Sequence, residues 1–136
     1  MKRLFTWNST YDIGVDSMNH QHQRLIDIMN TLYEQNQQGK PKALLLKTLV
    51  HLQEFTIKHF KEEESFMSSI HYTELERHQL VHKNLLYNLE DLIIKFKKSD
   101  SEKITEEFFE FLTFWLKSHI KGIDTRYGRF YKGKAS

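Results

Sequence analysis

The segment LLKTLVHLQEFTIKHFKEEESF, residues 45–66, repeats apolar side chains at intervals of three and four residues. Such spacing is typical of an amphipathic helix with one face in a core, and here the apolar positions are Leu45, Leu49, Leu52 and Phe55. His59 and Glu63 continue the same line. The segment therefore predicts a helix over about 42–68 whose buried face carries a histidine and a glutamate.

Three other segments have the same periodicity, and we expect helices over about 16–38, 73–98 and 102–121. Asp16 or Ser17 can cap the first of them, and Thr73 with Glu76 can form a capping box for the third. The connections between the segments are short, which favours antiparallel neighbours. The predicted fold is all-α: an antiparallel up-down-up-down four-helix bundle with an N-terminal arm.

The length of 136 residues fits a single domain. We expect residues 1–16 to form the arm, residues 17–121 the four-helix bundle and residues 122–136 a C-terminal segment. The arm contains Phe5, Trp7 and Tyr11, and this aromatic content predicts that it packs on the bundle.

Composition excludes several classes of partner. Lys and Arg number 20 against 18 Asp and Glu, and the basic residues do not gather into a stripe, so we expect no nucleic-acid binding. The chain has no cysteine, which is compatible with a reducing compartment. It has neither an apolar run of membrane-spanning length nor a signal peptide. We therefore expect a soluble, cytoplasmic protein without a membrane span, and favour a monomer.

Histidines and carboxylates gather on the predicted buried faces. His59 and Glu63 are four residues apart, as are His78 and His82, so each pair projects from one face of its helix. His22 lies near the start of the first helix and His119 near the end of the fourth. In an antiparallel bundle these four places coincide at one end.

Asp124 is a less direct candidate, because it follows His119 by five residues. In an ideal α-helix that separation turns the side chain about 140° away from His119. The two residues can share a face only if the helix loosens between them. Gly122 makes such loosening easy, since glycine tolerates irregular backbone.

Burying this many imidazoles and carboxylates without partners would be strongly unfavourable, and a metal centre removes the difficulty. Imidazole and carboxylate together suit iron, manganese, zinc or copper, and seven ligands are too many for one such ion but suitable for two. Any one pair taken alone is more typical of a surface or a satisfied core. Together they predict a dinuclear site with the ligands His22, His59, Glu63, His78, His82, His119 and Asp124.

Four short motifs stand in a particular order along the chain: QH at 21–22, HFxxEExxM at 59–67, HxxxH at 78–82 and WLxxHIxxxD at 115–124. With the aromatic arm before them, the chain resembles the bacteriohemerythrins over almost its whole length. The resemblance implies a non-haem di-iron centre with a bridging oxo or hydroxo group. It also implies that His78, His82 and His119 hold one iron and that His22 and His59 hold the other. Glu63 and Asp124 would then bridge the two ions. One departure is Asn19, which stands where the family commonly has an aspartate.

By this resemblance the expected function is reversible binding of dioxygen for storage, delivery or scavenging, without enzymatic activity. An unidentified partner would deliver or receive the oxygen. The alternatives are a di-iron enzyme acting on peroxide or nitric oxide, an oxygen- or iron-sensing module, and a purely structural bundle. The Glu-x-x-His motif of oxygen-activating bundles does not occur in the sequence, which favours a carrier. Residues near the ligands that could exclude water are Leu25, Ile26, Phe60, Trp115 and Leu116.

Overall fold

The computed structural model describes residue 7 and residues 9–135, without the side chains of residues 10, 121–123 and 134–135. Its helices are α1 (Asp16–Gln37), α2 (Lys42–Ser69), α3 (Leu75–Lys98), α4 (Glu106–Lys117) and α5 (Thr125–Ala135). A π-helical segment, Ser118–Asp124, joins α4 to α5. No strand occurs in the described part of the chain. Phe5, predicted as part of the arm, lies outside the described residues.

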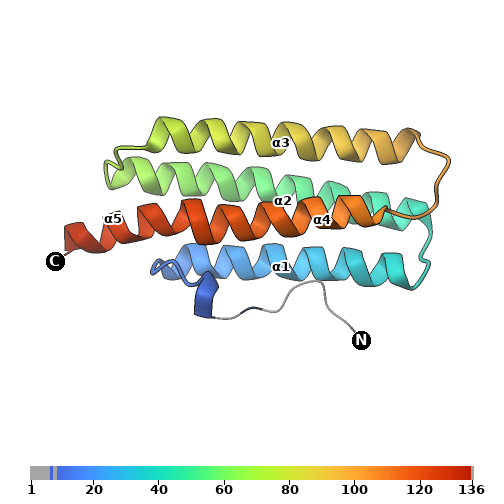
Figure 1. Ribbon diagram of the computed structural model, residues 1–136, viewed down its shortest axis with the longest axis horizontal. Helices are drawn as coiled ribbons and strands as arrows, with labels where there is room; N and C mark the ends of the chain where they lie inside the picture. Colours follow the sequence, from blue (N-terminus) through green and yellow to red (C-terminus); the bar gives the residue numbers. More distant parts are fainter. Residues whose placement is uncertain (1–6, 8, 136) are drawn as a thin grey trace.

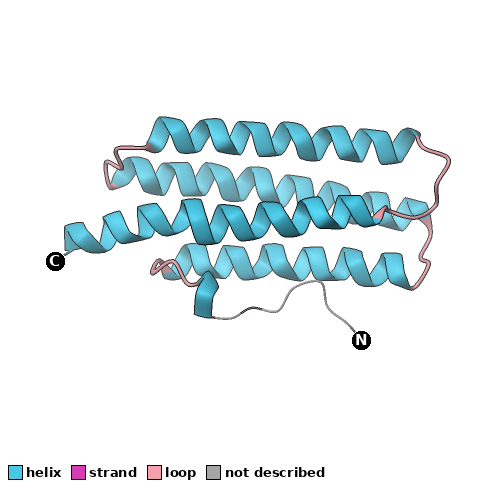
Figure 2. Ribbon diagram, in the orientation of Figure 1, coloured by secondary structure: helices cyan, strands magenta, loops and turns pink. Residues whose placement is uncertain are grey.

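The helices lie side by side and alternate in direction, with short loops at the two ends of the molecule (Figures 1 and 2). The last two helices and the π-helical segment between them form one continuous rod, which is the fourth member of the bundle (Figure 1). The prediction of an all-α antiparallel four-helix bundle is thus confirmed, with the fourth helix extending beyond its predicted end.

Apolar side chains on the facing sides of the four rods form one contiguous core. Its members include the predicted stripe residues of α2, of which Leu45, Leu49 and Leu52 are buried. Burial of this kind supplies most of the stability of a helix bundle, because isolated helices are marginal in water. None of the helices in the described residues combines the length and apolar character that crossing a membrane requires.

The helix starts differ from the predictions. The cap of α1 is Val15 rather than Asp16 or Ser17, and that of α3 is Glu74; neither side chain accepts a capping hydrogen bond. The predicted capping box of Thr73 and Glu76 is therefore wrong. Val15 is buried in the core, so packing determines where α1 begins.

The start of α4 is set by a contact between distant parts of the chain. The buried side chain of Asn36 donates to the carbonyl of Ile104 at 3.1 Å and accepts from its backbone N–H at 2.8 Å. This pairing anchors the loop that precedes α4. The helix begins only at Glu106, where the Thr105 hydroxyl accepts a hydrogen bond from the backbone N–H of Phe108 at 3.2 Å. The predicted start near residue 102 is therefore wrong.

The arm packs on the bundle in its described part. Tyr11, Ile13 and Val15 are buried in the core, and Trp7 stacks on Tyr11 with ring centroids 5.5 Å apart. The contact with α5 is close at Gly128, where a Cβ atom would stand 1.9 Å from the carbonyl oxygen of Ile13. Only glycine permits this approach.

Candidate metal centre

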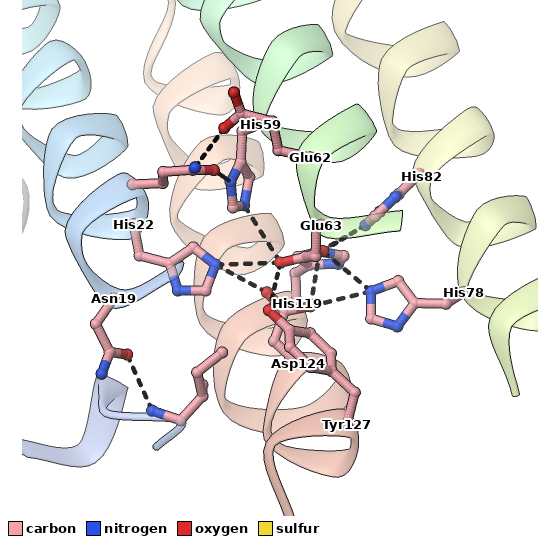
Figure 3. A network of polar contacts seen from close by, with 12 residues as sticks. Asn19, His22, His59, Glu62, Glu63, His78, His82, His119, Asp124 and Tyr127 are labelled. Atoms are coloured by element: carbon pink, nitrogen blue, oxygen red, sulfur yellow. Dashed lines mark hydrogen bonds and ion pairs between the residues drawn. The ribbon is translucent and has the colours of Figure 1, made fainter. Parts of the chain in front are cut away.

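All seven predicted ligands converge inside one end of the bundle (Figure 3). Each rod contributes: His22 comes from α1, one pair from α2, one pair from α3, and the last two residues from the π-helical segment. The side chains are buried, and none is more than 3 % exposed. The seven residues are His22, His59, Glu63, His78, His82, His119 and Asp124.

The seven side chains form two overlapping groups in which the potential ligand atoms lie within 4.8 Å of one another. One group contains three imidazoles and the other contains two. The two carboxylates, Glu63 and Asp124, belong to both groups. This division matches the ligand sets that the family resemblance implies.

The two carboxylates lie between the imidazoles, as Figure 3 shows. Oε1 of Glu63 lies 2.8 Å from Nε2 of His82 and 3.3 Å from Nε2 of His78. Its other oxygen, Oε2, lies 3.4 Å from Nε2 of His59. On Asp124 the two oxygens are likewise divided, with Oδ2 3.0 Å from Nε2 of His22 and Oδ1 3.0 Å from Nε2 of His78.

The π-helical segment explains how Asp124 reaches the same face as His119. Hydrogen bonds from residue i to residue i+5 widen the helix by one residue per turn, so residues five apart become neighbours along the axis. Nε2 of His119 lies 3.1 Å from Oδ1 of Asp124. The helix thus loosens over Ser118–Asp124, which contains Gly122, as the placement of Asp124 required.

Two imidazoles are oriented by side chains that sequence reasoning did not single out. Nδ1 of His59 contacts Oε1 of Gln21 at 2.5 Å, and Nδ1 of His82 contacts Oε2 of Glu64 at 2.9 Å. Because both partners are acceptors, each Nδ1 carries the proton and each Nε2 directs a lone pair into the site. Gln21 also donates to Glu62. Gln21 and Glu64 belong to the motifs QH and HFxxEExxM, but the motifs alone do not say which ring each side chain contacts.

Tyr127 supports the shared carboxylate. Its hydroxyl donates to Oε2 of Glu63 at 2.9 Å, and its ring is fully buried between those of Phe66, Tyr72 and His78. Tyr127 follows Asp124 by three residues, so it lies on the same face of the resuming helix. That spacing was the signal available in the sequence.

Asn19, the departure from the family pattern, faces the arm. Its Oδ1 accepts from the backbone N–H of Ile13 at 3.0 Å, and its Nδ2 donates to Asp12 at 2.8 Å. Nδ1 of His22 is buried without a hydrogen-bond partner among the described residues. Asn19 therefore fixes the arm rather than orienting His22.

Bound cations would satisfy the buried nitrogen and oxygen atoms of the site better than their contacts with one another do. Nε2 of His22, His59 and His78 and both oxygens of Asp124 are buried without a hydrogen-bond partner in the described part of the chain, despite the short distances. Nε2 of His82 lies 3.1 Å from Nε2 of His119. Because the proton of His82 is on Nδ1, its Nε2 offers a lone pair at this short distance. Metal ions between these atoms would satisfy all of them.

The groups of the site polarise one another strongly. Burial alone would lower the pKa of His119, but the nearby carboxylates of Asp124 and Glu63 raise it to about 10. Burial and the nearby charge of Glu63 would raise the pKa of Asp124. The contacts with His119 and His22 outweigh them, so the pKa lies below its ordinary value. The pKa of His59 is lowered by burial, which its contacts with Glu63 offset only in part. The carboxylates are thus held ionised, as ligands must be.

Apolar side chains cover the site on the side of α2 and α4. The ring of Phe60 stacks on His82 with centroids 3.7 Å apart and an interplanar angle of 1°. Trp115 packs edge-on against Phe60 at 6.1 Å. Leu116 is buried one turn before His119, and Leu25 and Ile26 are buried one turn after His22. All five predicted wall residues are therefore inside the core.

Residues 13–131 match the protein family described as Hemerythrin HHE cation binding domain. The chain belongs to the hemerythrin family. It is 32% identical over 127 residues to a bacteriohemerythrin of Clostridium acetobutylicum, covering 91% of this chain and 98% of that protein. A bacteriohemerythrin of Pseudomonas aeruginosa is 26% identical over 121 residues, covering 89% of this chain and 77% of the relative.

Crystal structures of hemerythrins have the same fold. Wild-type hemerythrin superposes with a TM-score of 0.83 at 28% identity, covering 93% of this chain and 96% of that chain. A leucine-to-alanine mutant gives a TM-score of 0.85 at 27% identity, covering 94% and 97%. Family and fold agree with the resemblance found in the motifs.

Proposed function

We propose that this hemerythrin-family chain holds two non-haem irons with a bridging oxo or hydroxo group, and that it binds dioxygen reversibly rather than acting as an enzyme. The observation that carries the proposal is the pair of overlapping ligand groups that share Glu63 and Asp124. A shared pair of carboxylates between unequal sets of imidazoles suits two ions held close together.

The proposed ligand sets are unequal. His78, His82 and His119 serve one ion, and His22 and His59 serve the other. The second ion therefore receives one protein ligand fewer, and an open position at a metal is where an exogenous molecule can bind. When bound, the irons would supply the electrons for reversible oxygen binding. The chain's residues would hold the ions and keep the position accessible.

The orienting contacts fix the rings of His59 and His82. With Gln21 and Glu64 accepting the Nδ1 protons of His59 and His82, neither ring has to reorganise when a metal binds. Tyr127 keeps its proton, because burial first and the charges of Glu63 and Asp124 next raise its pKa well above the ordinary value. It therefore remains a donor to Glu63 throughout the physiological range.

The wall of Phe60, Trp115 and Leu116 supports a carrier over an enzyme. These side chains are 1–3 % exposed, so water and reductants have little access to the site from that side. Exclusion of water favours release of the bound molecule as intact dioxygen. The role in storage, delivery or scavenging, the cytoplasmic location and a partner that delivers or receives oxygen belong to the same proposal.

The test is elemental analysis followed by oxygen titration. Purified protein is expected to hold two irons per chain, and after anaerobic reduction its visible absorbance should change on adding oxygen and return on removing it. Two zinc ions after iron-replete expression would refute the di-iron site. Rapid multiple turnover of peroxide or nitric oxide would favour the enzymatic alternative.

A further inference from the structure

The outer face of α3 carries a row of exposed apolar side chains. Leu80, Tyr87 and Ile94 are 63 %, 71 % and 41 % exposed, and successive members are seven residues apart, so they lie along one line of the helix. The line faces away from the buried His78 and His82 of the same helix. α3 lies at the outside of the bundle, and this face is not covered by another helix (Figure 1). Single exposed apolar residues are common, and these three are two turns apart, so the alignment of the row is combined below with the charges beside it.

The row is symmetric about its centre. Leu80 precedes Tyr87 by seven residues and Ile94 follows it by seven. If a second copy of α3 lies antiparallel with the two Tyr87 side chains in contact, Leu80 of each copy meets Ile94 of the other. A two-fold axis through the centre thus pairs every apolar side chain of the row.

The charged residues beside the row follow the same symmetry. Lys83 lies four residues before the centre and Glu90 three residues after it, and both are exposed on the same side of the row. In the antiparallel arrangement Lys83 of one copy meets Glu90 of the other. Glu76, eleven residues before the centre, meets Lys98, eleven residues after it. Each pair occurs twice, and a parallel arrangement would instead bring like charges together.

One approach in this arrangement is between like charges, because Arg77 of one copy lies toward Lys95 of the other. Lys95 already pairs with Asp91 of its own helix at 2.9 Å, which reduces its effective charge. Both residues lie on the exposed edge of the row, where solvent screens the repulsion. The approach therefore weakens the arrangement without preventing it.

We propose that two copies of this chain associate through α3, antiparallel about a two-fold axis at Tyr87. The contact is a single helix pair, so it belongs to the small interfaces that associate weakly. This departs from the monomer that the sequence favours. It does not depend on the metal site, because the face points away from the ligands.

The test is analytical ultracentrifugation of the metal-loaded full chain over a concentration series. The wild type is expected to move from 16.4 kDa toward twice that mass as its concentration rises toward about 1 mM. Lys83→Glu and Glu90→Lys are each expected to weaken association about tenfold, since the axis places each change at two contacts. The double variant Lys83→Glu/Glu90→Lys exchanges the charges and should restore the wild-type constant within about threefold.

Two further variants complete the experiment. Tyr87→Glu puts two carboxylates together on the axis and should abolish association, with the iron content of the wild type. Phe114→Glu is the matched control, because Phe114 is 74 % exposed but lies on α4. A wild type that remains monomeric at about 1 mM would overturn the proposal. So would single variants that associate normally, a double variant that fails to recover, or dissociation caused by Phe114→Glu and not by Tyr87→Glu.

Discussion

Replacing Tyr127 by phenylalanine removes one hydroxyl from the middle of the candidate site. That hydroxyl donates to Oε2 of Glu63 at 2.9 Å, and both side chains are fully buried. No other contact of the ring changes, because phenylalanine keeps the ring in place. The variant therefore isolates the contribution of one hydrogen bond to a charged carboxylate.

The expected loss follows from that geometry. A hydrogen bond to a charged group contributes about 1.5 to 3 kcal/mol, so we expect the free energy of unfolding to fall by about 2 kcal/mol. For a chain of 136 residues the unfolding entropy is about 0.3 kcal/mol per kelvin, and the melting temperature should fall by about 7 °C. The ligand set is intact, so two metal ions should still bind, but a chelator should remove them about tenfold faster.

The assay is thermal unfolding by circular dichroism, with and without metal, together with the rate of iron transfer to a chelator. Tyr131→Phe is the control, because Tyr131 belongs to the same helix but is 38 % exposed. Its melting temperature should change by less than about 2 °C. An equal change in the two variants, or an unchanged melting temperature for Tyr127→Phe, would mean that the hydroxyl does not support Glu63.

Three further predictions concern the shared carboxylate, the apolar wall and pH. Glu63→Ala removes a ligand from both groups, and elemental analysis should show that most of the iron is lost. Glu54 is an exposed glutamate of the same helix, and Glu54→Ala should keep its iron. Equal loss in the two variants would contradict the bridging role of Glu63. Leu116→Ala should admit water and speed oxidation of the oxygen-loaded protein, followed by absorbance, without changing the iron content. In the metal-free protein the pKa of His119 is raised to about 10, so the stability that this histidine adds is complete below its unfolded pKa of 6.5 and is lost as pH rises toward 10. Urea titrations showing a rise in stability over that range would refute this.

The helices could be predicted because their buried side chains recur at intervals of three and four residues. The stripe from Leu45 to Phe55 places α2 correctly, and the same period carries His59 and Glu63 to the interior. The helix ends were not predictable in this way. Val15 begins α1 because it is buried, and Asn36 delays the start of α4 by binding Ile104 from another part of the chain. Such contacts depend on the tertiary fold.

The convergence of the seven candidate ligands could also be inferred, because antiparallel helices bring those positions to one level. Their role as iron ligands stays a prediction. The orienting residues could not be found from periodicity. Gln21 and Glu64 sit beside the apolar faces, and their distances to His59 and His82 depend on how neighbouring helices are rotated. Because Glu64 contacts Nδ1 of His82, Glu64→Ala should weaken iron binding.

The π-helical segment between α4 and α5 has a consequence for how the chain tolerates insertion and deletion. Before and after this segment the rod is an ordinary helix, but the two parts are out of phase by one residue. Substitution within the segment leaves that phase intact. Deleting one residue between His119 and Asp124 would leave the two residues four apart in an uninterrupted α-helix, so that Asp124, Tyr127 and Gly128 would keep their direction. A residue deleted within α4 or α5 would instead turn every side chain beyond it by about 100°, so the π-helical segment is where this rod can lose a residue with the least disturbance.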